Sequence, residues 1–165
     1  MINTLRALEK SGYIDQIILH TPNSEKGSLT NFNVTIQSFR ETQPTRKTAT
    51  DSVWGMDGEY DFSTPETYNR RTFDITFNIY AELGDVYDQR NAFVKWLKSA
   101  DCRDSATPSS IYMEFSKRRN TRYSGLWFEI GAFSTPSEAL GHYVSYLNVK
   151  ITTDPRFTKD GETMI

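Results

Sequence analysis

One run of residues, from Arg71 to Tyr80, constrains the fold of this chain more than any other feature, because it alternates without a break. Its apolar members are Phe73, Ile75, Phe77 and Ile79, and its polar members are Thr72, Asp74, Thr76 and Asn78. Successive side chains of a strand point to opposite faces of a sheet, so this period of two predicts a strand with one buried face. The other face is expected to meet water or a partner.

Weaker versions of the same pattern predict further strands on both sides of this run. These segments are Tyr13 to His20, Phe32 to Gln37, Ile111 to Ser116, Leu126 to Phe133 and His142 to Thr152. The basic run from Lys117 to Arg122 is predicted to be a turn between two antiparallel strands, the second of which continues through Leu126 to Phe133. The residues after Pro155 form a polar tail that is expected to be loose or to pair with a neighbour.

One substantial helix is predicted from Val86 to Ser99, with Asp85 as its N-cap. Its apolar residues recur at helical spacing, so this helix is expected to cover the end or one face of the sheet. A second, short amphipathic helix is predicted from Met1 to Lys10. The stretch between the first two strands, through Gly27 and Asn31, is polar and is expected to be irregular.

The tally of about seven strands, with the main helix placed between strands rather than alternating with them, predicts an α+β fold with a mostly antiparallel sheet. The expected architecture is a β-sandwich or split barrel with one main helix flanking the sheet. Residues 1–30 are predicted to form an N-terminal extension of a short helix and the first strand. Residues 31–157 are predicted to be the β domain, and residues 158–165 a polar C-terminal tail.

The composition favours a soluble globular chain, with 37% apolar residues, 24% charged residues and a net charge of −2. A bulk electrostatic attraction to nucleic acid is therefore not expected. The single cysteine, Cys102, has no partner for an internal disulfide, and with two histidines it does not complete a four-ligand zinc site. No cofactor or metal is expected. The first ten residues lack the unbroken apolar stretch of a signal peptide, so we expect the chain to stay where it is made.

No catalytic constellation stands out, and an enzyme is not expected. Asp57, Glu59 and Asp61 form an acidic cluster beside aromatic residues, which leaves a carbohydrate-active or carbohydrate-binding domain as an alternative of another class. A calcium site at this cluster lacks the ligand order of an EF-hand. The basic run at Lys117 to Arg122 fits a contact with phosphates, a solvated turn or an ion-pairing contact with another subunit.

The segment from Glu41 to Phe62 is predicted to make contacts between subunits. Its first half has almost no apolar residues, so it has little apolar surface to bury against the core of its own chain. Ordering it costs backbone entropy, and contacts with another surface are needed to offset that cost. Its second half contains the aromatic residues and methionine that are enriched at interface centres. The predicted interface residues are Pro44, Arg46, Trp54, Met56, Tyr60, Phe62, Arg118, Arg119 and Arg122. The alternative is that the apolar members seal the edge of this chain's own sandwich.

The order of these features resembles the N-terminal domain of the distal tail proteins (the Dit family) of long-tailed phages, and the tail-tube fold that they share. Four passages show the likeness. They are Asn33 to Arg46, Trp54 to Asp61 with its two glycines, Tyr68 to Leu97 with its alternating strand and helix, and the closing strand that ends at Thr153 to Phe157.

The resemblance implies a structural virion protein of a phage tail or baseplate that forms a hexameric ring, joins the tail tube to the distal hub and leaves a lumen for DNA passage. A tail-tube subunit or a tube initiator is the related alternative. The implied partners are further copies of the chain and the tube, hub and tape-measure proteins, with DNA only in non-specific transit and no membrane. The implied location is the virion, after assembly in the host cytoplasm.

Overall fold

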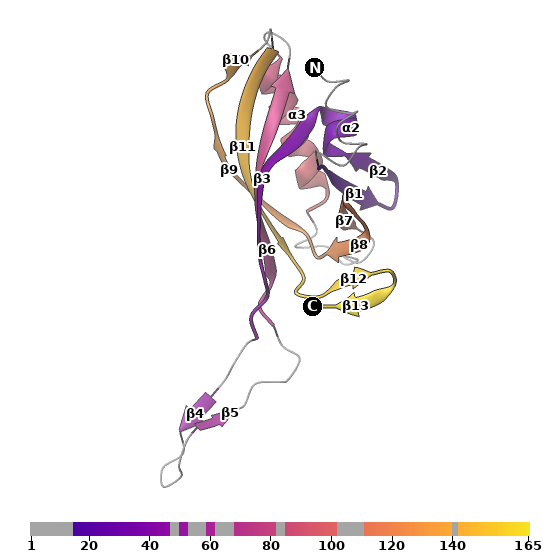
Figure 1. Cartoon of the computed structure of the whole chain (residues 1–165), viewed down its shortest axis with the longest axis vertical. Coiled ribbons are helices and arrows are strands. Elements are labelled where there is room, and N and C mark those ends of the chain that lie inside the picture. Colours follow the sequence, from indigo (N-terminus) through magenta and orange to yellow (C-terminus); the bar gives the residue numbers. More distant parts are fainter. Residues whose placement is uncertain are drawn as a thin grey trace.

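Strand β6 (Arg71–Ala81) lies inside a five-stranded antiparallel sheet and buries the apolar residues of the alternating run. The computed structural model describes residues 15–46, 50–52, 59–61, 68–81, 85–101, 111–139 and 142–165. The short helix predicted from Met1 to Lys10 lies outside these ranges. The prediction of a mostly antiparallel α+β fold with one main helix is confirmed, because two antiparallel sheets pack in a sandwich-like arrangement (Figure 1).

The five-stranded sheet has the order β10-β11-β6-β3, and β9 also pairs with β11. The added strands are β3 (Val34–Thr42), β9 (Trp127–Phe133), β10 (Ser137–Ala139) and β11 (His142–Thr153). The register between β6 and β11 is unbroken from Arg71 opposite Thr153 to Ala81 opposite Tyr143. By contrast, β3 and β9 each contain a register shift against their neighbour.

The second sheet has six strands in the order β13-β12-β8-β7-β1-β2. Their bounds are β1 (Ile17–Thr21), β2 (Ser24–Gly27), β7 (Tyr112–Phe115), β8 (Arg118–Ser124), β12 (Phe157–Lys159) and β13 (Glu162–Met164). Aromatic side chains join the two sheets: the ring centroid of Phe73 in β6 lies 5.6 Å from that of Phe115 in β7 and 5.0 Å from that of Tyr123 in β8. The contact with Tyr123 is edge-to-face, and such aromatic pairs add to the stability that burial provides.

Helix α3 (Val86–Ser99) has the predicted bounds and buries Val86, Phe93, Trp96 and Leu97 in the core. It packs on β6, with the ring of Phe93 in edge contact with Phe77 at 5.0 Å. Asp85 does stand at the N-cap position, but its side chain makes no capping hydrogen bond there, because its backbone is already in a helical conformation. The Gln89 amide instead donates to the backbone oxygen of Phe32 in the short helix α2 (Ser28–Phe32).

The polar stretch after the first strand, predicted to be irregular, contains two elements. Residues 24–27 form β2, an edge strand, and residues 28–32 form α2. Buried Gln16 organises this region, because its Oε1 accepts hydrogen bonds from the backbone N–H groups of Leu29 at 2.9 Å and Thr30 at 3.2 Å. These bonds satisfy donors at the start of α2 that have no partner within the helix.

The predicted basic turn at Lys117 to Arg122 is wrong for most of its length. Only Ser116 and Lys117 form the turn, and the rest belongs to strand β8. Long cationic side chains suit a strand whose exposed face is wet, so charge alone does not mark a turn.

Leu126 to Phe133 was predicted to continue this strand, and that prediction is wrong. The segment crosses to the other sheet, where Trp127–Phe133 forms β9. Gly125, with a φ of +67°, makes the break between the two strands. The polar tail is not loose, because β12 and β13 form a hairpin that pairs with β8 of the same chain.

Residues 43–70 separate β3 from β6 and are called the arm, and the two described strands within them lie away from the two larger sheets (Figure 1). The arm includes the two-stranded sheet of β4 (Thr50–Ser52) and β5 (Glu59–Asp61), which pairs with no other strand in the described part of the chain. The arm is therefore set apart from the core that the other strands share.

Candidate subunit interface

The base of the arm is held by a small set of backbone and side-chain contacts. Arg46 and Tyr68 form an isolated antiparallel bridge. Next to it, the backbone N–H of Asn69 donates to the oxygen of Thr45 at 2.8 Å, and the Asn69 amide donates to the Thr45 hydroxyl at 2.8 Å. The two segments of the arm therefore leave the body as a paired ribbon.

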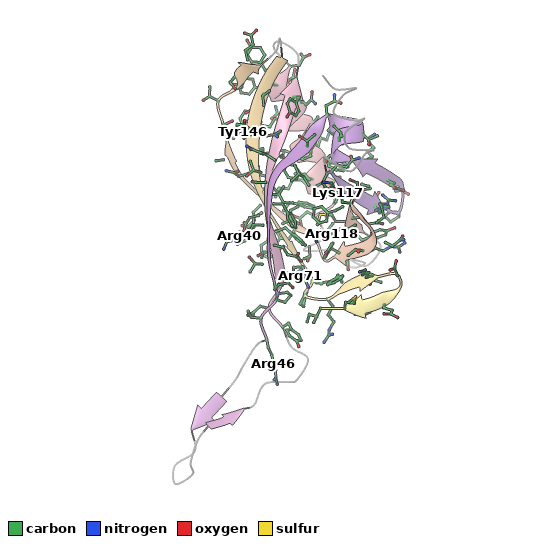
Figure 2. All side chains as sticks on the ribbon, in the orientation of Figure 1. Arg40, Arg46, Arg71, Lys117, Arg118 and Tyr146 are labelled. Atoms are coloured by element: carbon green, nitrogen blue, oxygen red, sulfur yellow. The ribbon has the colours of Figure 1, made fainter. Side chains whose placement is uncertain are left out.

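Predicted interface residues lie along this arm. Pro44 is half-buried and precedes β4 in the chain. Arg46 is exposed and also precedes β4 (Figure 2). Tyr60 belongs to β5, while Trp54, Met56 and Phe62 lie outside the described residues. Glu59 and Asp61 of the acidic cluster are also in β5, and Asp57 lies outside the described part of the chain. The contact role of these residues stays a prediction.

Arg71 anchors the arm to the body and was not predicted from the sequence. Its side chain is 1% exposed, and its Nη1 lies 2.6 Å from Glu41 Oε1 and 2.9 Å from Gln43 Oε1. Its Nη2 donates to the backbone oxygen of Pro155, and its guanidinium lies 4.9 Å from the ring centroid of Phe157. One buried cation thus joins β3, β6 and the C-terminal hairpin.

A signal for Arg71 is present in the sequence. Arg71 is the first residue of the alternating run and stands two residues before Phe73, so the alternation places it on the buried face. A charged residue on the buried face of a strand needs a partner of opposite charge. That partner, Glu41, is 30 residues away in the chain and was predicted only as the start of a polar segment.

The three predicted interface arginines of β8 point to two sides of the six-stranded sheet. Arg118 lies against Phe39 and Phe115, with centroid distances of 5.3 and 5.8 Å, and 3.6 Å from Glu41 Oε2. The other two arginines contact β7 residues on the opposite face of the sheet. Arg119 contacts Glu114, and the Arg122 guanidinium lies 4.6 Å from the ring centroid of Tyr112. The structure therefore brings the arginines onto one strand but not onto one face.

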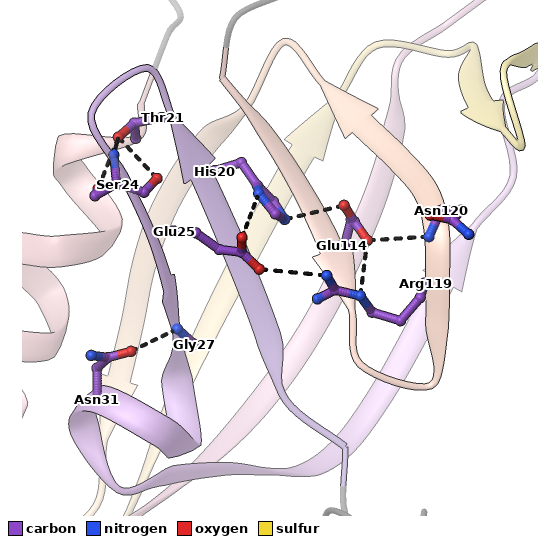
Figure 3. A network of polar contacts seen from close by, with 9 residues as sticks. All are labelled: His20, Thr21, Ser24, Glu25, Gly27, Asn31, Glu114, Arg119 and Asn120. Carbon is purple, nitrogen blue, oxygen red and sulfur yellow. Dashed lines mark hydrogen bonds and ion pairs between the residues drawn. The ribbon is translucent and has the colours of Figure 1, made fainter.

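A polar network surrounds His20 on the outer face of the six-stranded sheet (Figure 3). His20 Nε2 lies 3.1 Å from Oε1 of Glu114, a carboxylate with 4% exposure, although the contact does not have the geometry of a hydrogen bond. Glu114 Oε2 accepts a hydrogen bond from the backbone N–H of Asn120 and lies 3.4 Å from Arg119 Nε. Glu25 lies 3.7 Å from His20 Nδ1 and completes the ring of charges.

Burial lowers the pKa of His20 below its usual value of 6.5, and this effect exceeds the opposing attraction of Glu114 and Glu25. The imidazole is also stacked on Tyr112, with ring centroids 4.3 Å apart. Neutral His20 is therefore the form that the folded chain favours near neutral pH. Burial also raises the pKa of Tyr123, whose hydroxyl stays protonated.

The outer face of the five-stranded sheet holds a groove of about 480 Å³. A row of four charged residues crosses it in register: Arg40 of β3 opposite Asp74 of β6, Lys150 of β11 opposite Asp74, and Glu129 of β9 opposite Lys150. Beside this row the Thr76 hydroxyl donates to Asn148 Oδ1 at 2.8 Å. Tyr146 extends from the same face and is 41% exposed (Figure 2). The face is polar, and its charges balance.

Within the described ranges, no group of three or more histidine, cysteine or acidic side chains is arranged to hold a metal ion. Cys102 lies outside those ranges. None of the helices in the described part of the chain combines the length and the apolar character needed to cross a membrane.

In a comparison with known proteins, residues 25–103 match the model of the family described as phage tail protein RIFT-related domain. This stretch runs from β2 through the arm and β6 to just beyond the end of α3. The resemblance to phage tail proteins is thus confirmed over these residues. No curated protein matches the chain.

Among solved structures, the chain is similar to the Dit protein of phage SPP1, which is described as a paradigm of the hub adsorption apparatus in phages that infect Gram-positive bacteria. The TM-score is 0.47 and the sequence identity 18%. The match covers 86% of this chain and 51% of the SPP1 protein, so the chain spans about half the length of that relative.

Proposed function

We propose that this chain, whose residues 25–103 match a phage tail protein domain, is a structural protein of a phage tail that works by assembling into a ring. The family match is the observation on which the proposal rests. The ring continues the tail tube, joins it to the distal hub and leaves a lumen for DNA. A hexamer is the ring order that the resemblance to distal tail proteins implies.

The free edges of the five-stranded sheet support assembly. Among the described strands, β3 pairs only with β6, and β9 only with β11, so each leaves a row of backbone N–H and C=O groups without a strand partner. Free edges are sites at which another chain can add its own strand. Two such edges on opposite sides of one sheet suit a ring in which each copy contacts two neighbours.

The arm supports the same proposal. In the described part of the chain, the base of the arm is held to the body by the ion pair of Arg71 with Glu41, by the Arg70 guanidinium, which donates to the backbone oxygen of Gly125, and by Arg156, which lies 5.7 Å from the ring centroid of Tyr68. A polar segment with few apolar residues loses backbone entropy when it is ordered, and the surface of a neighbouring copy is the natural source of the compensating contacts.

The balanced charge of the outer face of the five-stranded sheet suits a lumen. Basic surfaces bind DNA by neutralising phosphates and releasing counterions. The row of Arg40, Asp74, Lys150 and Glu129 has equal numbers of positive and negative groups, so it offers DNA no net attraction. DNA is expected to pass such a face without being held.

The remaining assignments follow from this proposal. The partners are other copies of the chain and the tube, hub and tape-measure proteins, and the location is the virion, after assembly in the host cytoplasm. The protein is not an enzyme. A tail-tube subunit or tube initiator has the same geometry, and the position of the chain in an intact particle separates it from a distal-tail ring.

The test is the oligomeric state of the purified full chain. Light scattering coupled to size-exclusion chromatography, with negative-stain imaging of the same fractions, is expected to reveal closed rings. A chain that stays monomeric at high concentration, both alone and with tube or hub protein added, contradicts the proposal.

A further inference from the structure

The row of charged residues on the outer face of the five-stranded sheet ends at both edges of that sheet. Arg40 stands on the edge strand β3, and Glu129 stands on the edge strand β9. Both side chains are exposed, and in the described part of the chain neither forms an ion pair. The sheet therefore presents a positive side chain at one edge and a negative one at the other.

These are the only charged side chains that the two edge strands turn to the outer face. The other charged residue of β3, Glu41, turns to the inner face and pairs with Arg71. The sequence of β9 has no charged residue besides Glu129. Asp74 and Lys150 fill the middle of the row, so the signs alternate from β3 to β9, and a second copy placed beside the first continues the alternation.

The directions of the two edge strands suit pairing between copies. β3 is antiparallel to β6, β6 to β11, and β11 to β9, so β3 and β9 run in opposite directions. In a ring whose axis lies along the strands, the rotation from one copy to the next keeps these directions. β9 of one copy and β3 of the next therefore meet as an antiparallel pair.

Apolar surface lies beside both edges on the inner face. Phe39, next to Arg40, is 38% exposed even though its ring contacts Phe115. Ile130, next to Glu129, is half-buried and lines a largely apolar groove of about 330 Å³ between α3 and β9. In an antiparallel pair, the register that puts Glu129 opposite Arg40 also puts Ile130 opposite Phe39. One register thus matches opposite charges on one face and apolar side chains on the other.

We propose that Glu129 of one copy stands opposite Arg40 of the next copy, and that Ile130 of the first copy stands opposite Phe39 of the second. The inference rests on the proposed function and names the side chains at which β9 and β3 of neighbouring copies meet. Opposite charges across paired strands stabilise the pair, and like charges destabilise it. A slip of two residues leaves both charges without a partner across the contact, and a slip of one turns Phe39 to the polar face, so other registers are disfavoured.

Charge swaps in the purified full chain test the charged pair. The single variants are Glu129→Lys and Arg40→Glu, and the double variant has both changes. The matched control is Glu162→Lys. Both glutamates are exposed and stand opposite a lysine of their own chain, Lys150 or Lys159, so the two changes add the same repulsion within the chain. Circular dichroism melting checks that each variant is folded.

Sedimentation velocity over a range of concentrations is expected to give the wild type and the control the same midpoint of ring assembly. Each single variant puts like charges at every contact between copies, which is expected to raise that midpoint concentration by about tenfold or more. The double variant keeps the repulsion within the chain but restores opposite charges between copies. Its midpoint is therefore expected to return to within about threefold of the wild-type value.

Disulfide cross-linking tests the register itself. Arg40→Cys and Glu129→Cys are combined with Cys102→Ser, which removes the only native thiol. Within one copy, positions 40 and 129 lie three strand spacings apart, about 14 Å, which is too far for a disulfide. Mild oxidation is therefore expected to link neighbouring copies into a ladder of covalent multimers. Moving the first thiol to Ser38 or Thr42 is expected to slow the linking by about tenfold, because the sulfur atoms no longer face each other.

The outcomes separate the two proposals. A wild type that stays monomeric, alone and with tube or hub protein added, contradicts the proposed function and this contact together. Rings that form equally for the wild type and the single variants, with no cross-linking through positions 40 and 129, overturn only the contact. Failure of the double variant to recover, with its melting unchanged, overturns it as well. Faster cross-linking through position 38 or 42 overturns the register, and with it the pairing of Glu129 with Arg40.

Discussion

Arg71 and Glu41 form an ion pair at the point where the arm leaves the body, with 2.6 Å between Nη1 and Oε1. The guanidinium is almost fully buried, and the carboxylate is 15% exposed and also lies near Arg118. Burying two charges costs solvation, which good geometry and further hydrogen bonds offset. Gln43 and the backbone oxygen of Pro155 provide those bonds. This pair therefore sets where the arm begins.

Replacing Arg71 with Met is expected to lower the free energy of unfolding by about 3 kcal/mol, because it leaves Glu41 without its main partner and removes the link to the C-terminal hairpin. Chemical denaturation measures the change. The neighbouring Arg70 is the matched control, since its side chain is 44% exposed in its pair with Asp154, and Arg70→Met is expected to cost about 1 kcal/mol or less. Equal effects at the two positions contradict the anchoring role of Arg71.

His20 is expected to make the stability of the chain depend on pH. Its pKa is lower in the folded chain than its unfolded value of 6.5, so the unfolded state binds more protons as the pH falls below that value. The folded state therefore loses stability as the pH falls from 6.5 towards the lowered pKa, and its full contribution is present above 6.5.

The matched variant is His20→Gln, which keeps a polar side chain but does not titrate. Urea unfolding at a series of pH values is expected to give a smaller loss of stability for this variant than for the wild type on the acidic side. Parallel curves for the two proteins mean that other groups are responsible for the dependence.

Gly125 is expected to tolerate alanine poorly. It adopts a φ of +67° between β8 and β9, and an added Cβ lies 2.3 Å from Asp154 Oδ1, so the Asp154 side chain has to move and its pair with Arg70 is disturbed. Gly161 is the control, because it has a φ of +85° in the C-terminal hairpin with nothing within 4 Å of an added Cβ.

We expect Gly161→Ala to cost about 1 kcal/mol from the backbone conformation alone, and Gly125→Ala to cost more. Thermal unfolding of the two variants measures the difference. A smaller cost at Gly125 than at Gly161 shows that Asp154 moves without penalty.

Elements whose apolar residues recur periodically within one segment could be predicted from the sequence, whereas contacts between distant segments could not. The alternation from Arg71 to Tyr80 and the helix from Val86 to Ser99 are periodic within one segment, and both were predicted correctly. Most of strand β8, residues 118–122, was predicted as a turn, because a run of cations suggested exposure and the buried Thr121 gives no apolar signal. The arginines on the exposed face of β8 have partners on β7, namely Glu114 for Arg119 and Tyr112 for Arg122, and these pairs are not visible in the local sequence.

The candidate interface divides in the same way. Composition indicates the arm, since a polar stretch with too few apolar residues is visible in the sequence. The anchor of that arm was missed, because Arg71 and Glu41 meet only through the antiparallel pairing of β3 and β6, in which Glu41 stands opposite Phe73. The C-terminal hairpin was also missed, since its residues are mostly polar and were predicted to form a tail.

Trp54 and Met56 provide the last prediction, because they stand in the arm segment that we propose to contact a neighbouring copy. Changing both to Ser is expected to abolish ring assembly, since a well-buried aromatic anchor at an interface contributes about 2 kcal/mol or more. The free energy of unfolding of the isolated chain is expected to change by no more than about 0.5 kcal/mol, the usual range for substitutions at surface positions. Light scattering and calorimetry on the same sample separate the two effects. Unfolding of the double variant assigns the two side chains to the chain's own sandwich, and normal assembly assigns the interface to another surface.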